Sequence, residues 1–186
     1  NTIINVPDIK RKPILGNKVI NKISFRDDYA YLSCGFGIVV LDLAGEEIRD
    51  TWYIGPQGSQ VNVFDLTHND TAFFAATEDG IFYANIDHPN LAISGLEQAG
   101  VAPYPYSPYD LIESYAGKVV VNLKKGGNIA EDTIFYFDGS TWTRLFFEDN
   151  LGVNNINANN GKLVISLNYA GKVFNEDMVE EQSIFT

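Results

Sequence analysis

The chain has 186 residues, 45% of them apolar, with 24 acidic and 13 basic side chains and a formal net charge of −11. Because this charge would repel a phosphate backbone, nucleic-acid binding is excluded as an expected function. No apolar run approaches the roughly 18 to 20 residues that a membrane-spanning helix needs, so no membrane span is expected. The single cysteine, Cys34, has no partner for an intramolecular disulfide and is expected in the core.

A strand-rich pattern recurs four times along the chain. Tyr31, Phe73, Val119 and Leu163 occupy the same place in successive copies, at a step of roughly 44 residues that is typical of four-stranded propeller blades. The apolar runs are short, β-branched or aromatic, and separated by Gly, Asn and Asp, which favours strands over helices. The sequence therefore predicts an all-β chain, a β-propeller made of about four four-stranded antiparallel blades.

In chain order, the first blade is expected over residues 18–55 and the second over residues 60–96. Polar turn formers separate segments of hairpin length in both blades. The expected strands are residues 19–25, 29–34, 38–43, 46–54, 61–66, 72–77, 81–86 and a vaguely defined outer strand at 91–94.

The third blade is expected over residues 108–147 and the fourth over residues 152–186. Residues 1–8 are interpreted as the outer strand of a preceding blade, and residues 170–171 as a turn in the fourth blade. The expected strands are residues 109–115, 118–123, 133–137, 141–145, 153–157, 162–167, 172–175 and 183–185.

Four segments carry a family pattern, namely residues 5–9, 30–43, 47–55 and 75–81. They resemble the N-terminal propeller of PorZ-type proteins, which belong to the type IX secretion machinery of Bacteroidetes and are related to the two-component regulator propellers. The resemblance implies a larger propeller of about seven blades, followed by further domains. The chain is therefore expected to be an arc of such a propeller.

The resemblance also implies a function. It indicates a non-enzymatic interaction module of a PorZ-like protein at the cell surface, associated with the outer membrane, or in the periplasm, with any targeting signal outside these 186 residues. Its expected partners are a protein of the secretion machinery, a glycan or lipopolysaccharide, in a pathway that handles anionic lipopolysaccharide for the sortase step. The alternatives are a ligand-sensing propeller of a hybrid two-component regulator that binds a glycan and, third, a propeller hydrolase.

Few side chains suggest chemistry, and no catalytic, cofactor or metal residue is predicted. His68 and His88 lack metal-like spacing and are interpreted as surface turn residues. Residues 138–142 resemble the Asp-box of sialidase-like propellers, a structural turn, with Trp142 packing between blades. Paired acidic residues are similar to the paired carboxylates of glycosidases, but they are expected at turns as solvated charges. These pairs are residues 27–28, 78–79, 131–132, 148–149 and 176–177.

One segment is predicted as a contact surface. In residues 102–109, tyrosines alternate with prolines, which hold an extended backbone at low entropic cost and could present the rings to a sugar or a protein. The candidate contact residues are Tyr104, Tyr106 and Tyr109, with Trp52 and Tyr53 as a second set. The alternative interpretation is a crossover between blades whose rings cover a blade edge.

Self-association is also predicted from the repeat. An arc of four blades would leave apolar side chains uncovered on its two end faces, and two chains could pair to cover them. The residues expected on such faces are Ile38, Ile81, Phe135 and Val164.

Overall fold

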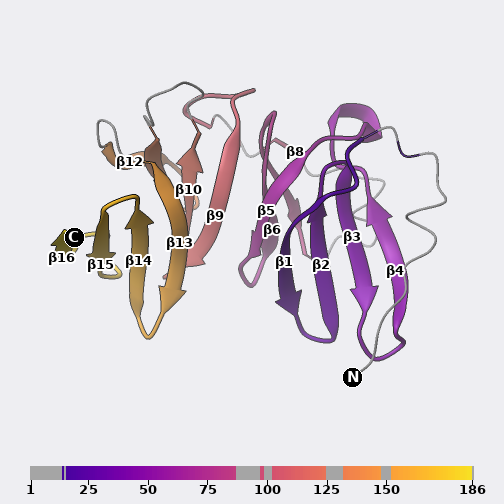
Figure 1. The fold of residues 1–186 in the computed structure, drawn as a ribbon, viewed down its shortest axis with the longest axis horizontal. Helices are drawn as coiled ribbons and strands as arrows, with labels where there is room; N and C mark the ends of the chain where they lie inside the picture. The colour runs from indigo at the N-terminus through magenta and orange to yellow at the C-terminus, as the bar shows by residue number, and fades with distance from the viewer. Residues whose placement is uncertain are drawn as a thin grey trace.

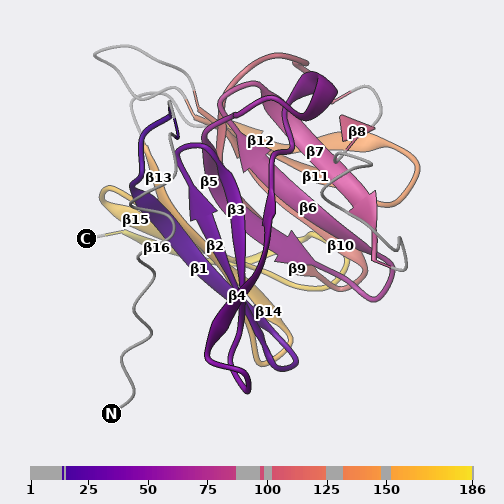
Figure 2. The same cartoon turned by 90° about the vertical axis from the view of Figure 1, so that its right-hand side faces the viewer.

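The computed structural model describes residue 14 and residues 16–86, 97–98, 102–124, 132–147 and 152–185. Over these ranges the chain forms four antiparallel sheets, each with four strands in chain order. Figure 1 shows the sheets side by side, from the first at the right to the fourth at the left, and Figure 2 views them from the side of the first sheet. The predicted all-β propeller architecture is confirmed.

The first two blades occupy the first half of the chain. A single 3₁₀ turn, Pro56–Gly58, lies between them. The first blade contains β1 (Ile20–Arg26), β2 (Tyr29–Cys34), β3 (Gly37–Asp42) and β4 (Glu47–Trp52), and the second contains β5 (Val63–His68), β6 (Ala72–Thr77), β7 (Gly80–Asn85) and β8 (Glu97–Gln98).

The last two blades repeat the same order. The third contains β9 (Tyr109–Tyr115), β10 (Lys118–Leu123), β11 (Thr133–Phe137) and β12 (Trp142–Phe147), and the fourth contains β13 (Val153–Asn159), β14 (Lys162–Leu167), β15 (Ala170–Phe174) and β16 (Glu180–Phe185). Inner strands of successive blades, such as β1 and β5 or β5 and β9, contact each other along the centre of the arc.

Several predicted elements need correction. The turn expected at residues 170–171 is wrong, because Gly171 pairs with Ser166 inside the sheet and the turn lies at residues 168–169. His68 ends β5, and the turn begins at Asn69, whose side chain accepts the backbone N–H groups of Thr71 and Ala72. The strand expected at 91–94 and the segment 1–8 lie outside the described residues.

Apolar side chains from facing sheets form one cluster at each junction between blades. Rings of Tyr31, Trp52 and Phe73 meet between the first and second blades. The second junction gathers Ile81, Ile112 and neighbouring residues, and the third gathers Ile134, Ile165 and others. Burying these faces against one another is the main source of stability in a propeller arc.

The end faces differ from the prediction. Ile38, Ile81 and Phe135 are buried inside the junctions rather than exposed on open faces, because each points toward a neighbouring blade. Val164, on the far face of the fourth blade, is exposed as expected. The far face of the first blade is also buried, because its apolar side chains form a fourth cluster and Ile14 packs against it. Cys34 belongs to this cluster, and burial raises the pKa of its thiol to about 11. Self-association therefore stays a prediction, and of the four residues expected on open faces only Val164 is exposed.

Polar side chains of the inner strands join the blades near the centre of the arc. Ser24 Oγ donates to the Leu66 carbonyl at 2.7 Å across the first junction. Asp65 Oδ2 accepts the Ile112 N–H at 3.1 Å across the second. The third junction has a bond from outside the inner strand of its blade, since Asp132, which directly precedes β11, accepts the Val153 N–H at 2.9 Å. Because the inner strands of neighbouring blades do not share a sheet, these bonds satisfy backbone groups that would otherwise be buried without a partner.

Candidate functional site

The predicted tyrosine patch is divided by the structure. Tyr104 and Tyr106 lie in the connection before β9 and are 52% and 77% exposed. Tyr109 is 0% exposed, its hydroxyl donates to the Tyr104 carbonyl at 3.4 Å, and burial raises its pKa to about 12. Tyr109 therefore belongs to the core, and its inclusion in the contact surface is wrong. Contact through Tyr104 and Tyr106 stays a prediction.

The second set of predicted contact residues is also mostly covered. Trp52 is 6% exposed, because its ring packs 5.5 Å from that of Tyr31 and 5.6 Å from that of Phe73 between the first and second blades. Its indole N–H donates to Asp50 Oδ2 at 3.1 Å. Tyr53 is half-buried against Phe36, with ring centres 6.5 Å apart. The inclusion of Trp52 in a contact surface is thus wrong.

The other candidates take structural places. His68 contacts the edge of the Phe73 ring, and His88 lies outside the described residues. The Asp138 carboxylate accepts hydrogen bonds from the backbone and side chains of Ser140 and Thr141, which hold its pKa well below the usual range. Trp142 stacks on Phe137 and packs at the second junction, as predicted. In the described part of the chain, no group of three or more His, Cys, Asp or Glu side chains could hold a metal ion.

Two carboxylates on inner strands have raised pKa values. Burial raises the pKa of Asp65, and the positive charge of Lys22, 2.7 Å away, offsets part of this rise. Burial also raises the pKa of Glu113, with the charge of Asp65 adding to it. Both oxygens of Asp65 accept protein N–H groups, from Leu66 and Ile112, so this carboxylate serves to join β5 to β9. The sequence did not predict that Asp65 and Glu113 are buried, because their burial depends on the packing of β5 against β9, whose bonded residues Asp65 and Ile112 are 47 positions apart.

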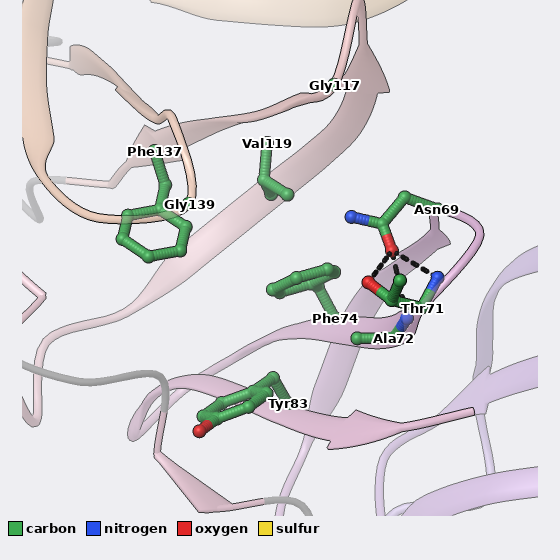
Figure 3. Close-up of a pocket in the computed structure, with 9 residues that line it drawn as sticks. All are labelled: Asn69, Thr71, Ala72, Phe74, Tyr83, Gly117, Val119, Phe137 and Gly139. Carbon is green, nitrogen blue, oxygen red and sulfur yellow. Dashed lines mark hydrogen bonds between the residues drawn. The ribbon is translucent and has the colours of Figure 1, made fainter. Parts of the chain in front are cut away.

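A cavity of about 330 Å³ lies between the second and third blades. It is bounded by the β5–β6 turn, by β6 and β7 of the second blade, and by β10 and the ends of the β9–β10 and β11–β12 turns of the third (Figure 3). Its volume is at the lower end of the range of small-ligand sites. The lining residues are Asn69, Thr71, Ala72, Phe74, Tyr83, Gly117, Val119, Phe137 and Gly139.

Aromatic rings from both blades form the walls. Phe74 and Tyr83 are stacked, with ring centres 6.1 Å apart and planes inclined by 21°. On the other blade, Phe137 stacks on Trp142 at 5.1 Å and 29°. Phe74 is buried, whereas Tyr83 is 36% exposed, so the stack leads from the cavity to the surface. The arrangement offers flat apolar walls on both sides of the opening.

A fixed amide stands at one edge of the cavity. Asn69 Oδ1 accepts three hydrogen bonds, from the Thr71 N–H at 2.9 Å, the Thr71 hydroxyl at 3.0 Å and the Ala72 N–H at 2.9 Å. These donors define which end of the amide is oxygen, so the amino group takes the opposite direction. In Figure 3 the amide nitrogen points toward the space between Val119 and Phe74. Asn69 can therefore donate a hydrogen bond to a bound molecule.

Small side chains keep this space open. Val119 is the second residue of β10 and pairs with Ser114. In the second blade the equivalent residue is Phe73, the second residue of β6, which pairs with His68. A valine thus stands in the third blade where the second blade has a ring. Gly117 and Gly139, at positive φ of 74° and 99°, have nothing within 4 Å of where a Cβ would lie. The repeat aligns Phe73 with the smaller Val119, and this decrease in side-chain size is the sequence signal that could have predicted the cavity.

The cavity and the exposed tyrosines lie on opposite rims. β9 begins at Tyr109, beside Leu123, and ends at Tyr115, beside Lys118. Tyr104 and Tyr106 precede the first end, whereas Gly117 lies just beyond the second. The chain thus has two separate candidate contact surfaces.

The family whose model describes the N-terminal β-propeller domain of PorZ, of the TSS9 system, matches residues 1–93, half of the chain. The chain belongs to the PorZ N-terminal β-propeller family. No curated protein matches this PorZ-family sequence. The described residues contain no helix long and apolar enough to cross a membrane.

Solved structures share the fold of this PorZ-family chain. Two are of the extracellular domain of BT4673 from B. thetaiotaomicron, described as a one component and as a hybrid two component system, with TM-scores of 0.64 and 0.58 and identities of 12% and 11%. Each match covers 88% of this chain but only 21% and 22% of the BT4673 chains. The WD40 domain of Pan2 from Neurospora crassa matches with a TM-score of 0.61 and 9% identity, covering 94% of this chain and 52% of that one. At these identities the likeness shows the propeller fold alone.

Proposed function

We propose that this chain is a non-enzymatic interaction module of a PorZ-like protein that acts at the cell surface or in the periplasm and takes part in type IX secretion. The family match over residues 1–93 supports the assignment to this system. The extracellular propellers of BT4673 support a place outside the cytoplasm, since they share the fold.

The observation that carries a binding function is the cavity between the second and third blades. Its nine lining residues include no carboxylate, imidazole, thiol or ammonium group, which are the usual general acids, bases and strong nucleophiles. Its walls are aromatic and one edge holds a fixed amide donor, which is the composition of a binding site. The geometry therefore favours holding a ligand over cleaving one.

The expected partners follow from the charge of the chain. A net charge of −11 opposes direct binding of an anionic lipopolysaccharide by attraction, so a protein of the secretion machinery or an uncharged part of a glycan is the better partner for this module. Tyr104 and Tyr106 supply an exposed aromatic surface for a protein contact.

A second candidate function is ligand sensing. It is supported by the two BT4673 structures, which are extracellular domains of signalling systems and cover most of this chain. In that case the same cavity would receive the signalling ligand.

Gene replacement in the parent bacterium tests the proposal. The full-length gene is replaced by one carrying Tyr104→Ala with Tyr106→Ala, or by one carrying Tyr83→Ala, and surface attachment of type IX cargo is measured beside transcription. We expect less attached cargo at unchanged protein abundance from at least one replacement, because both surfaces are exposed and outside the core. Altered ligand-dependent transcription with normal cargo would contradict the secretion role and favour the sensor.

The absence of enzymatic activity is tested separately with the purified chain. Chromogenic glycosides and esters are supplied, and Glu113→Gln is the comparison because Glu113 is the half-exposed inner-strand carboxylate with a raised pKa. We expect no turnover by either protein. Turnover that disappears in Glu113→Gln would replace the binding proposal with a hydrolase.

A further inference from the structure

We propose that the cavity between the second and third blades binds one uncharged pyranose ring of a glycan. The inference rests on the interaction-module function proposed above and names the chemistry that the cavity recognises. It is carried by three features of the described residues, namely the paired aromatic walls, the oriented amide of Asn69 and the absence of charge in the lining.

The aromatic walls suit a flat ring with C–H groups on its faces. Tyr83 is partly exposed over the buried Phe74, and Phe137 stands on the opposite blade, backed by Trp142. The face of an aromatic ring carries negative potential, which attracts the weakly positive hydrogens of a sugar ring. Each stack is already held in place by its partner ring, so little side-chain freedom is lost on binding.

The polar groups lie at the edge, where the hydroxyl groups of a pyranose project. Asn69 presents its amino group because its oxygen is occupied by three donors from Thr71 and Ala72. The Thr71 hydroxyl gives its hydrogen to Asn69 Oδ1 and keeps lone pairs that can accept. A purely apolar ligand would leave these groups without partners, whereas a sugar hydroxyl can satisfy both.

The electrostatics favour an uncharged ring over a uronic acid or an amino sugar. None of the nine lining side chains is charged. The nearest cation along the chain, Lys118, directs its ammonium to the Glu176 carbonyl of the fourth blade at 2.9 Å, away from the second. The Asp138 carboxylate, next to Gly139, is occupied by four hydrogen bonds within its own turn. A charged sugar would therefore lose hydration without gaining an ion pair.

The test uses binding by the whole chain. Methyl glycosides of glucose, galactose, mannose and N-acetylglucosamine are titrated and observed by saturation-transfer NMR, with methyl glucuronide, methyl glucosaminide and N-acetyltyrosine amide as comparison ligands. We expect saturable binding of at least one neutral glycoside, at least tenfold tighter than that of either charged sugar. Tyr83→Ala is expected to weaken this binding about tenfold, because one wall is lost.

A substitution at Asn69 isolates the amide donor. Asn69→Asp keeps an oxygen to accept from Thr71 and Ala72 and replaces the amino group by a second acceptor, so the turn is retained while the donor is lost. We expect binding to weaken about fivefold to tenfold. The matched control is Asn175→Asp in the fourth blade, where Oδ1 accepts the N–H groups of Asp177 and Val179 in a similar turn remote from the cavity. This control is expected to bind as the wild type does.

Three results would overturn the inference. They are no saturable binding of any neutral glycoside, binding that survives both Tyr83→Ala and Asn69→Asp, and tighter binding of a charged sugar or of N-acetyltyrosine amide. The last result would assign the cavity to a peptide side chain. Failure here is distinguishable from failure of the module function, because cargo attachment that depends on Tyr104 and Tyr106 would keep the secretion role while the sugar site is abandoned.

Discussion

The first and second blade junctions are built to the same plan and filled differently. At the first, the Phe73 ring lies 5.0 Å from Tyr31 and 5.6 Å from Trp52, and the Arg26 guanidinium covers it at 5.7 Å. At the second, Val119 takes the equivalent place, and the space that a ring would fill is part of the cavity. The contrast indicates that one missing ring in a repeat is enough to leave a cavity in an otherwise packed junction.

Hydrogen bonds between the inner strands connect the blades at both junctions, including the junction that contains the cavity. Across the first, Ser24 and Asn21 donate to backbone carbonyls of β5. Across the second, Asp65 and Thr67 accept the N–H groups of Ile112 and Ser114 on β9. The second junction thus retains its polar bonds near the centre of the arc while it opens at the rim, which leaves the cavity on a fixed support.

The largest expected effect comes from emptying the filled junction. Phe73→Ala removes a ring that is buried against two others, and it is expected to lower the free energy of unfolding by about 3–5 kcal/mol. Val119→Ala, at the equivalent place in the hollow junction, removes fewer atoms and is expected to cost less than half as much. Urea denaturation measures both, and equal costs would contradict the contrast between the junctions.

A smaller effect is expected from the carboxylate that joins the second and third blades. Asp65→Asn is expected to lower the free energy of unfolding by about 1–3 kcal/mol, because an amide offers only one oxygen to the N–H groups of Leu66 and Ile112 and turns an N–H group toward the other. Burial raises the pKa of Asp65 in the folded chain, so its ionisation costs stability. The advantage of the wild type over the variant should be fully present below about pH 4 and shrink as pH rises through the raised native pKa. Denaturation at several pH values measures this, and an advantage that grows with pH would refute the assignment.

The turn at the cavity wall should show the opposite pH dependence. Asp138→Ala removes a carboxylate whose pKa is lowered by hydrogen bonds from Thr141 and Ser140. Its contribution to stability should be present above about pH 4, the ordinary range of the group, and be lost as pH falls toward the lowered native value. The loss in the variant is expected to be smaller than that in Asp65→Asn because Asp138 is exposed. A loss that persists unchanged in acid would show that the charge is not involved.

The smallest stability effect is expected at the other rim of the second junction. Tyr104→Ala combined with Tyr106→Ala should change the free energy of unfolding by no more than about 1 kcal/mol, because Tyr106 is exposed and Tyr104 has one edge contact, with Phe135. Tyr109→Ala is the control, with an expected loss of about 3–5 kcal/mol from the core. Thermal unfolding of the two proteins separates the outcomes, and a large loss in the double variant would assign Tyr104 and Tyr106 to packing.

The sequence predicted the strands better than the surface. β2, β6 and β10 have the bounds that were expected, because short apolar runs follow clear turn residues. Trp52 and Tyr109 were misplaced because each aromatic residue stands where a strand meets a connection. There, local sequence does not show whether a ring turns toward the neighbouring blade or toward solvent.

Long-range geometry explains what the sequence did not predict. Asp65 interrupts the apolar run of a predicted strand, and it is buried because β9 packs over it. The cavity likewise needs the aromatic stack of the second blade and the glycine turns of the third to meet across a junction. The change from Phe73 to Val119 marked the position, but only the packed blades show that no other side chain of the described residues fills it.

The most direct test fills the hollow junction with the side chain of its neighbour. Val119→Phe places in the third blade the residue that the second blade has at Phe73. Binding of neutral methyl glycosides is measured by titration for the wild type and the variant, with unfolding followed in parallel. We predict that the wild type binds and that the variant, while still folding cooperatively, does not. Undiminished binding by a folded Val119→Phe chain would contradict the claim that the missing ring creates the site.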